Sequence, residues 1–326
     1  MRALRIASWL LLVLALLAGA GFWAGLRLLD QYLTTAGPLT SETIVVLPPG
    51  VGLAGIAERL ASAEAIGDPL VFRLAARWIG KDRSLKAGEY RIDPGATPLE
   101  ILELLEAGKV LLHRLTVAEG LTVAEVWKIL EESEVLVGPL PPRPVEGTVL
   151  PETYLFSKGE SRAKLAERMR VGMASLLAEA WAARPSDLKL ASPEEALILA
   201  SIIEKETALA EEYPLVAAVF HNRLRRSMRL QSDPTVIYGI TKGEKSLGRA
   251  LTRADLEAAT PYNTYKIDSL PPGPIANPGR GAIEAALAPA DVDYLYFVAD
   301  GSGGHAFANS LAEHNRNVQR WRRLGR

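Results

Sequence analysis

The chain has 326 residues, of which 48% are hydrophobic and 23% are charged. This composition is too apolar for a disordered chain and too charged for a protein that crosses a membrane many times. Thirty-seven basic residues against 38 acidic residues give a net charge of −1, so no overall positive field favours nucleic acid as a partner. Cysteine is absent, which excludes disulfide scaffolds, cysteine-ligated zinc, iron–sulfur clusters and thiol nucleophiles.

The N-terminal region carries one long uncharged stretch, the 21 residues from Ile6 to Leu26. A helix of about 20 apolar residues is long enough to cross the hydrocarbon core of a bilayer. Arg2 and Arg5 precede the stretch, so the positive-inside rule places residues 1–5 in the cytoplasm and everything beyond a membrane helix at 6–29 outside it. A cleaved signal peptide is the alternative, because Ala18-Gly19-Ala20 resembles a cleavage site. The apolar stretch exceeds a signal core, so we expect a single-pass anchor in the inner (plasma) membrane.

A strand, a glycine turn and a short helix recur three times, with the glycines at Gly50, Gly95 and Gly120. In each copy the residues six, seven and ten positions after the glycine are apolar, which is typical of one face of a helix. One such unit cannot bury its own apolar face, so we expect the copies to pack on one another or on a neighbour. The spacings between the glycines are unequal, which argues against a solenoid.

The second half of the chain has a different character. Four prolines between 132 and 147 predict a linker. Ser192, Pro193 and Glu195 together form a strong start signal for a helix. Helical patterns and one apolar run predict the following elements: helices at Ala163–Ala183, from Pro193 to about Ala210, at Pro214–Arg226 and at Ser310–Arg323, and a buried strand at Tyr294–Val298. The fold class is therefore α+β.

Glu206 falls in the middle of the most apolar stripe of the helix that begins at Pro193, when each residue turns the helix by about 100°. A carboxyl group on such a stripe loses hydration, which raises its pKa. A pKa near neutrality is what a general acid for glycosidic or acyl cleavage needs. The alternative is a helix end at the surface, with Glu204, Lys205 and Glu206 all solvated. The pattern alone leaves both interpretations open.

Three polar segments follow this helix, at Gln231–Thr235, Pro261–Tyr265 and Gly301–Asn309. They combine aromatic rings, amides, hydroxyl groups and an imidazole. Sugar rings present apolar faces and hydroxyl groups, so these segments together favour a groove that binds carbohydrate. The sequence has no Gly-x-Ser-x-Gly elbow and no His-Glu-x-x-His zinc motif, and the glycine run at Gly301–Gly304 lacks the lysine of a phosphate loop.

These residues resemble the endolytic murein transglycosylase family, the MltG/YceG-like proteins. The similarity covers nearly the whole chain and is densest in five segments: Leu199–Thr207, Leu230–Gly239, Tyr262–Tyr265, Leu270–Gly279 and Tyr294–Asn315. The resemblance implies that Glu206 is the catalytic acid, with Glu204 as the alternative. It implies that a further set of side chains positions the sugar: Gln231, Asp233, Asn263, Tyr265, His305 and Asn309.

One segment departs from the pattern of the family. The family usually has an aromatic residue before Pro-Asp-Thr-Tyr, whereas this chain reads Leu150-Pro151-Glu152-Thr153-Tyr154. The acidic side chain is one methylene longer and the aromatic residue is missing. The resemblance implies a substrate contact at Glu152, and this expectation rests on the altered motif.

The resemblance also implies a domain order. It places a polar tether at 30–43, a LysM-like glycan-binding module at 44–131, a proline-rich linker at 132–147 and a YceG-like catalytic domain at 148–326. The expected fold is thus a transmembrane helix, a small α/β module and a mixed α+β catalytic domain. The body of the protein is expected to be periplasmic or otherwise extracytoplasmic.

The expected substrate is a nascent peptidoglycan glycan strand, cut between N-acetylmuramic acid and N-acetylglucosamine. The product would carry a 1,6-anhydro end, which terminates elongation of the strand. The resemblance implies no metal or organic cofactor, and cell-wall synthesis proteins as partners. The alternatives are a lysozyme-like hydrolase and a non-catalytic, membrane-anchored scaffold that binds peptidoglycan. A Glu206 that lies with the segments of Gln231, Asn263 and His305, rather than in bulk solvent, favours an enzyme over the scaffold.

Overall fold

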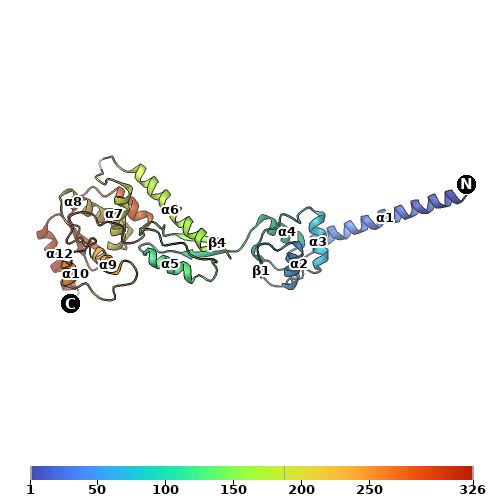
Figure 1. Cartoon of the computed structure of the whole chain (residues 1–326), viewed down its shortest axis with the longest axis horizontal. Helices are drawn as coiled ribbons and strands as arrows, with labels where there is room; N and C mark the ends of the chain where they lie inside the picture. The colour runs from blue at the N-terminus through green and yellow to red at the C-terminus, as the bar shows by residue number, and fades with distance from the viewer. Residues whose placement is uncertain (1, 187, 325–326) are drawn as a thin grey trace. The chain divides into compact units, whose positions relative to one another are not determined.

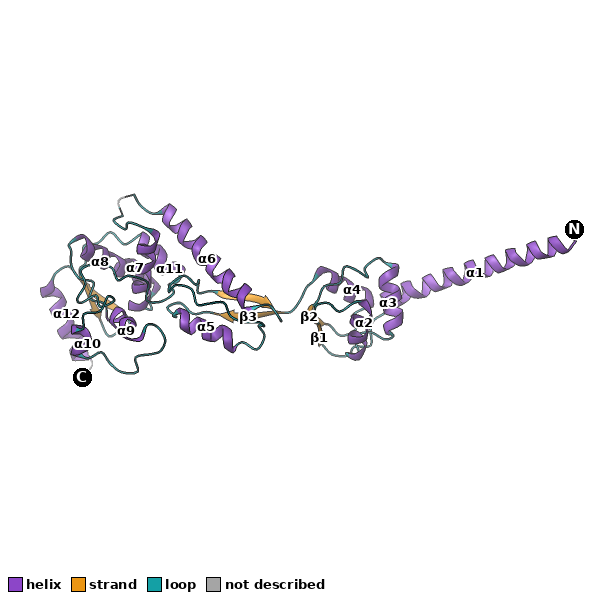
Figure 2. Ribbon diagram, viewed as in Figure 1, coloured by secondary structure: helices purple, strands orange, loops and turns teal. Residues whose placement is uncertain are grey.

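The computed structural model describes residues 2–186 and 188–324. It is a mixed α+β structure that divides into two compact units, residues 1–113 and residues 114–326 (Figure 1). Helices predominate, and the strands form small two-stranded sheets (Figure 2). Each unit is described by itself below.

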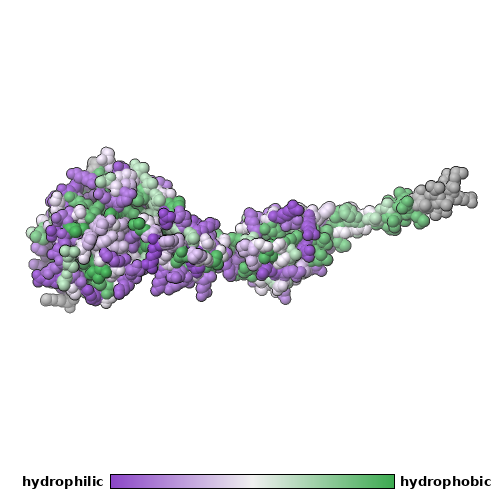
Figure 3. Space-filling view, in the orientation of Figure 1, coloured by the Kyte–Doolittle hydropathy of each residue, from purple (hydrophilic) through white to green (hydrophobic). Residues whose placement is uncertain are grey.

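The first unit begins with α1 (Arg2–Thr34), a helix that is long and apolar enough over Trp9–Thr34 to cross a membrane. Its large apolar side chains are exposed over most of this length, and Figure 3 shows them along the described part of the helix. Exposed apolar surface of this extent needs a lipid or protein partner. The last turn is different, because Leu33 is only 4% exposed and packs into the core of the unit. The helix is therefore compatible with a single-pass anchor.

The rest of the first unit follows the order strand, helix, helix, strand, helix. Its elements are β1 (Thr43–Leu47), α2 (Leu53–Ser62), α3 (Pro69–Trp78), β2 (Gly88–Ile92) and α4 (Pro98–Ala107). The two strands pair antiparallel, with Val45 opposite Tyr90. One face of this pair and the inner faces of the three helices form a core around Phe72 and Leu60, which are fully buried.

The second unit opens with a small sheet and two helices. Its elements are β3 (Leu112–Thr116), α5 (Val123–Glu132), β4 (Thr153–Ser157) and α6 (Arg162–Ala183), and β3 pairs with β4. The unit boundary at 113/114 falls within β3. The core between these elements contains Trp127, Phe156 and Met169.

The larger part of the second unit is helical. It comprises α7 (Pro193–Glu206), the short 3-10 helix η1 (Ala210–Glu212), α8 (Tyr213–Arg225), α9 (Asp233–Thr241), α10 (Arg253–Glu257), α11 (Arg280–Leu287), the antiparallel pair β5 (Tyr296–Ala299) and β6 (His305–Ala308), and α12 (Leu311–Leu324). Helix α7 lies at the centre of the core and packs against α6, α8 and α11.

The three predicted strand–turn–helix copies are confirmed as elements, since the helices α2, α4 and α5 follow Gly50, Gly95 and Gly120. The apolar residues at the shared positions are buried in all three helices. All three glycines have positive φ, between 69° and 83°, which suits a residue without a Cβ. The third copy packs in the core of the second unit.

Two predicted elements differ from the structure. Helix α7 ends at Glu206, four residues before the predicted Ala210, because Thr207 is extended with φ −140° and ψ 144°. The predicted buried strand at Tyr294–Val298 is β5, whose residues are all partly exposed. A two-stranded sheet has no neighbouring strands to cover it, so its apolar residues stay partly open.

The proline-rich segment at 132–147, predicted as a linker, is held to its neighbours by hydrogen bonds. The indole of Trp127 donates to the carbonyl oxygen of Pro141 at 2.9 Å, and the backbone N–H of Val137 donates to Glu160 at 3.0 Å. Proline cannot donate from its own nitrogen, so the segment is fixed by bonds at the residues between its prolines.

Candidate active site

The candidate acid, Glu206, is the last residue of α7. The helix begins as predicted, with the Ser192 side chain accepting from the backbone N–H of Glu195 and Pro193 in the first turn. It stops because Thr207 makes side-chain bonds that compete with the helix. The Thr207 hydroxyl donates to Glu212 at 2.8 Å and accepts from the backbone N–H of Leu209 at 3.1 Å.

Helix α7 is buried on all sides in its middle, up to Ile203. The eight consecutive residues Ala196–Ile203 are buried, and Ser201 ties the helix to a loop by accepting from the backbone N–H of Ile275 at 3.0 Å. A helix that is packed all round has no freedom to rotate. The direction in which Glu206 projects is therefore set by the core.

The pKa of Glu206 is raised to about 7, first of all because burial removes water from its carboxyl group. The charge of Asp233 adds to the rise, while Ser232, His305 and Arg223 oppose it. The place of Glu206 at the C-terminal end of a helix acts in the same direction, because the negative end of the helix dipole disfavours a carboxylate. The residue is nevertheless only partly buried, so a substrate can reach it. The rise in pKa predicted from the apolar stripe is confirmed.

Ser232 supplies a hydroxyl group beside the acid. The residue is 2% exposed, and among the described residues its Oγ has no hydrogen-bond partner of normal geometry. It lies close enough to Glu206 to lower the pKa of that carboxyl group. Its position is fixed through its backbone N–H, which donates to the Thr264 hydroxyl at 2.9 Å. A buried hydroxyl without a partner is costly, so this group is poised to bond a ligand or the acid itself.

Asp233 and Tyr265 form a pair next to Glu206. The phenol of Tyr265 donates to Asp233 Oδ1 at 2.6 Å, and burial followed by the hydrogen bond to Asp233 raises the pKa of Tyr265. Asp233 is exposed at the start of α9. The pair joins two of the three polar segments that the sequence singled out.

Arg223 of α8 places a positive charge near the acid. The guanidinium is 7% exposed, donates to the backbone oxygens of Leu230 at 2.9 Å and Leu295 at 2.7 Å, and reaches the side-chain oxygen of Gln231 at 3.3 Å. Gln231 itself has φ 51° and lies exposed at the surface. Arg223 thus holds the backbone on both sides of the site, and its charge stabilises an ionised Glu206.

His305 and Glu212 form a second pair near the acid. The Nδ1 atom of His305 lies 2.7 Å from one carboxyl oxygen of Glu212, and its backbone N–H donates to the other at 2.7 Å. These bonds, together with the imidazole itself, hold the pKa of Glu212 below its ordinary value although burial opposes this. Glu212 also accepts from Thr207. The residue after the acid and the imidazole near it therefore share one carboxylate.

The remaining predicted site residues lie differently. Asn263 is fully buried, and its side-chain amide donates to backbone oxygens at the end of α10, including Ala258 at 2.6 Å. Its oxygen accepts from the backbone N–H of Tyr265, so it shapes the loop that carries this tyrosine. Asn309 is exposed and bonds Glu313 through its backbone N–H. Glu152 is exposed at the start of β4, where its carboxylate accepts from Thr153. In the described part of the chain, no contact joins Asn309 or Glu152 to Glu206.

Glu204, the alternative acid, has a structural set of partners. Its carboxyl group accepts from the backbone N–H of Gly279 at 2.9 Å and from the phenol of Tyr213 at 3.1 Å. Burial raises its pKa, and the charge of Glu119 adds to this. Both oxygens are thus engaged in holding α7 to its neighbours, whereas Glu206 faces the polar segments.

Sequence reasoning missed Arg223 and Glu212, and it included Ser232 only as a member of the polar segment Gln231–Thr235. A charged residue in the middle of a helix, or next to another acid as Glu212 is to Glu211, looks like part of a solvated surface. Only the pairing across the fold shows otherwise. Among the residues that the structure describes, no three His, Asp or Glu side chains gather as a metal site.

Comparison with known proteins adds to this geometry. The model of the YceG-like family matches residues 45–320. A curated Bacillus subtilis protein named endolytic murein transglycosylase is 28% identical over 337 residues, covering 94% of this chain and 91% of that protein. A Streptococcus pneumoniae protein of the same name is 29% identical over 352 residues, and the match covers 94% of this chain and 63% of the relative.

A solved structure is also similar. The crystal structure of a yceG-like protein from Listeria monocytogenes aligns with a TM-score of 0.52 at 30% sequence identity. The alignment covers 85% of this chain and 99% of that chain. The similarity therefore extends over most of both chains.

Proposed function

Because the chain belongs to the YceG-like family, we propose that it is an endolytic murein transglycosylase that cuts peptidoglycan glycan strands. The observation that carries the proposal is the carboxyl group of Glu206, with a pKa of about 7 and with Ser232, Asp233, Arg223 and His305 around it. A carboxyl group of this kind is protonated in part at neutral pH and serves as a general acid. The surroundings of Glu206 support an enzyme over a non-catalytic scaffold.

The proposed reaction needs one carboxyl group. Protonated Glu206 donates its proton to the glycosidic oxygen between N-acetylmuramic acid and N-acetylglucosamine, and the C1–O bond breaks through an oxocarbenium-like state. The carboxylate then accepts the proton of the muramic C6 hydroxyl, whose oxygen bonds to C1 of the same ring. The products are a free C4 hydroxyl on one sugar and a 1,6-anhydro ring on the other, and Glu206 is protonated again.

The neighbouring groups have roles that follow from their charge. Asp233 is an exposed carboxylate that stabilises positive charge at C1. Arg223 stabilises the ionised form of Glu206. His305, held by Glu212, and the hydroxyl of Ser232 orient the sugar and the acid. Tyr265 offers an aromatic ring beside Asp233, and Asn263 fixes the loop that carries it.

A lysozyme-like hydrolase is the second candidate, favoured by the charge of Asp233 close to Glu206. Enzymes that use water need a second carboxylate as base or nucleophile. The two reactions differ in their products. A transglycosylase leaves 1,6-anhydro ends, and a hydrolase leaves reducing ends.

The test is mass spectrometry of the ends released from purified glycan strands by the full chain. We expect 1,6-anhydro ends, and their loss in Glu206→Gln. Glu204→Gln is the matched control, because glutamine keeps an oxygen for the Gly279 N–H. Reducing ends would favour the hydrolase, and full activity in Glu206→Gln would contradict the assignment of the acid.

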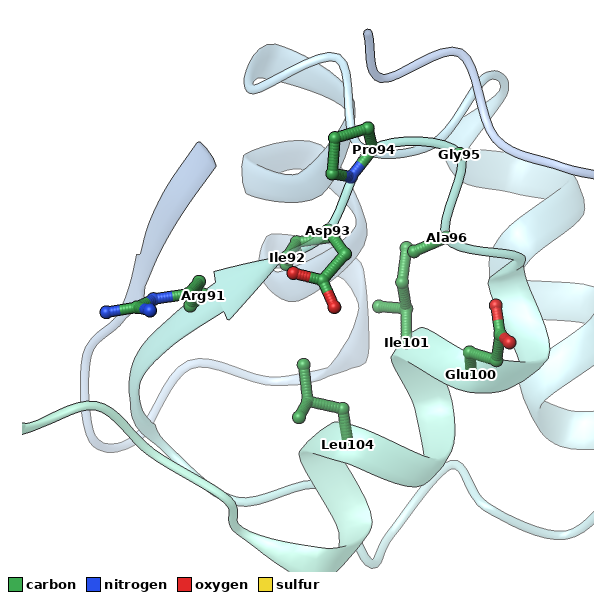
Figure 4. Close-up of a pocket in the computed structure, with 9 residues that line it drawn as sticks. All are labelled: Arg91, Ile92, Asp93, Pro94, Gly95, Ala96, Glu100, Ile101 and Leu104. Atoms are coloured by element: carbon green, nitrogen blue, oxygen red, sulfur yellow. The ribbon is translucent and has the colours of Figure 1, made fainter. Parts of the chain in front are cut away.

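For residues 44–131 we propose a LysM-like module that holds the glycan; residues 44–113 of this range lie in the first unit and 114–131 in the second. Its order of strand, helix, helix and strand supports this, as does a cavity of ≈430 Å³ between the end of β2 and α4. In this cavity the Asp93 carboxylate and the Leu104 side chain face one another, with Ile101 and Glu100 nearby (Figure 4). Sugars suit such a mixture of apolar and acceptor groups. We expect the Asp93→Ala variant to be retained less on insoluble peptidoglycan than the parent chain.

We further propose that α1 anchors the chain with its N-terminus in the cytoplasm and the catalytic unit outside. Arg2 and Arg5 before the apolar stretch support this orientation. The proposed action on nascent strands, which ends their elongation, requires a catalytic unit on the same side as the cell-wall synthesis proteins.

A further inference from the structure

A second cavity, of ≈520 Å³, lies in the catalytic unit and is lined in part by the elements that hold the acid. It is lined by the start of α5, the end of α7, helix α9 and the loop at 243–249. Lys205 of its lining precedes Glu206, and Pro234 follows Asp233. The cavity therefore adjoins the proposed site of cleavage, although neither Glu206 nor Asp233 lines it.

The charge of this cavity is positive. Three of its lining residues are cationic, Lys205, Lys245 and Arg249, against one carboxylate, Glu125. The Glu125 carboxylate accepts from the backbone N–H of Thr122 at 2.8 Å in a capping box. The cations of the lining therefore outnumber its carboxylate by three to one.

The cations differ in how far they are already paired. Arg249 donates to both oxygens of Asp255, at 2.6 Å and 3.0 Å. Lys205 donates to the backbone oxygen of Gly120 at 3.1 Å. For the exposed Lys245, no carboxylate within the described residues lies at ion-pair distance. Lys245 is therefore the charge that is most available to a ligand.

The loop that carries Lys245 is fixed in place. The hydroxyl of Thr122 donates to the backbone oxygen of Gly243 at 2.7 Å, and Arg143 pairs with Glu244 at 2.7 Å. The lining also includes the apolar side chains of Ile237, Leu247 and Ile275. A lining that combines cations with apolar side chains suits a small anionic group that also carries aliphatic carbon.

We propose that this cavity binds the acidic stem peptide that hangs from the muramic acid of the substrate strand. The proposal rests on the proposed function and names a further part of the substrate. In murein the sugars are neutral, and the carboxylates belong to the peptide, which also carries the methyl groups of alanine. A peptide of five residues reaches up to about 17 Å when extended, so a peptide on a sugar held at Glu206 reaches a cavity that begins one residue away in sequence.

The first experiment compares two substrates with the full chain. One is peptidoglycan strands that keep their stem peptides. The other is the same strands after an amidase has removed the peptides and the lactyl carboxylates freed by this hydrolysis have been converted to neutral methyl amides. We expect Lys245→Glu to lower the ratio of kcat/KM for peptide-bearing strands to kcat/KM for bare strands by about fivefold. The ratio for the parent chain is expected to fall with salt, since exposed charges are screened.

Lys164→Glu is the matched control, because Lys164 is exposed on α6 and does not line this cavity. It is expected to leave the ratio unchanged. An equal effect of Lys245→Glu on both substrates, or no effect on either, would overturn the proposal. Cleavage of neither substrate by the parent chain would instead count against the proposed function.

A second experiment does not depend on catalysis. A free synthetic stem peptide is titrated into the Glu206→Gln chain, and binding is followed by the chemical shifts of labelled isoleucine methyl groups, including Ile237 and Ile275. We expect shifts at these two residues that weaken in the added Lys245→Glu variant. Shifts that are absent, or that are the same in both chains, would contradict the proposal.

Discussion

Glu206 couples the stability of the fold to pH. Its pKa is about 7 in the folded chain against 4.5 for the free side chain, so the folded state favours the protonated form. The contribution of the protonated Glu206 to the free energy of unfolding is fully present below pH 4.5 and is lost as the pH rises through about 7. Glu206→Gln removes the dependence. We expect the variant to be more stable than the parent by about 3 kcal/mol at pH 8 and to match the parent at pH 4.

Urea denaturation at the two pH values measures this difference. Glu179→Gln, at an exposed position on α6, is the control and is expected to track the parent at both. A Glu206→Gln chain that gains no stability at pH 8 would show that the carboxyl group is fully hydrated.

His305 influences the same carboxyl group of Glu206 through its charge. It lowers the pKa of Glu206, and Glu212 holds its imidazole. We expect His305→Ala to lower kcat by on the order of 10²-fold, because a sugar or acid displaced by about 1 Å loses that much. We also expect the alkaline limb of the pH–rate profile to move to higher pH, since one influence that lowers the pKa of the acid is gone.

The pH profile separates this role from a structural one. Glu212→Gln keeps the shape of its side chain, so it is expected to move the alkaline limb in the same direction with a smaller loss of kcat. A loss of kcat with an unmoved limb in both variants would show that the pair only supports the fold.

At the scale of elements, two helices begin with the same device. Thr97 opens α4 and Thr122 opens α5, each in a capping box with a glutamate. Thr122 in addition donates to the backbone oxygen of Gly243. Replacing either with alanine is expected to cost about 1 kcal/mol for the cap, and Thr122→Ala about 1 kcal/mol more for the second bond.

Chemical denaturation measures both losses of stability. The loss for each variant is taken from the unfolding transition of the unit that contains the replaced threonine. Thr122→Ser and Thr97→Ser retain the hydroxyl group and are expected to stay near the parent. Equal losses for the two alanine variants would show that the bond to Gly243 contributes nothing to stability.

The same scale shows what the sequence can predict. Helices α6 and α8 begin and end within one residue of the prediction, because their apolar spacing and flanking prolines are local signals. The predicted end of α7 is four residues too late, because the observed end depends on bonds between Thr207 and both Glu212 and Leu209. Those bonds form between side chains whose direction no periodicity specifies.

Some residues of the candidate site could likewise be expected from the sequence, and others could not. The apolar stripe of α7 singled out Glu206 but left two interpretations open, and the polar segments favoured only a carbohydrate groove. The family resemblance implied Glu206 as the acid and Asp233, Tyr265 and His305 as residues that position the sugar. Arg223 of α8 depends on a bond to Leu295 just before β5, and Glu212 of η1 depends on bonds to His305 of β6. These bonds join residues about 70 to 90 positions apart. A single sequence carries no signal for such contacts.

For the whole molecule, the absence of cysteine makes the orientation of the chain directly measurable. A single cysteine introduced at Ala182, which is exposed near the end of α6, is expected to react with a membrane-impermeant maleimide in intact cells. A cysteine at Ala3 is expected to react only after the membrane is permeabilised. The reverse pattern would contradict a cytoplasmic N-terminus, and labelling of both sites without permeabilisation would contradict a membrane-spanning α1.

The all-round burial of α7 has a consequence for how this enzyme can be altered. A helix that is packed on every face cannot rotate to compensate for a change in its length. One inserted residue would turn its end by about 100° and advance it by about 1.5 Å. A carboxylate moved to position 207 or 205 therefore points to a different neighbour and does not replace Glu206. Engineering of a new specificity has to leave this helix at fixed length and work through the loops that surround its last residue.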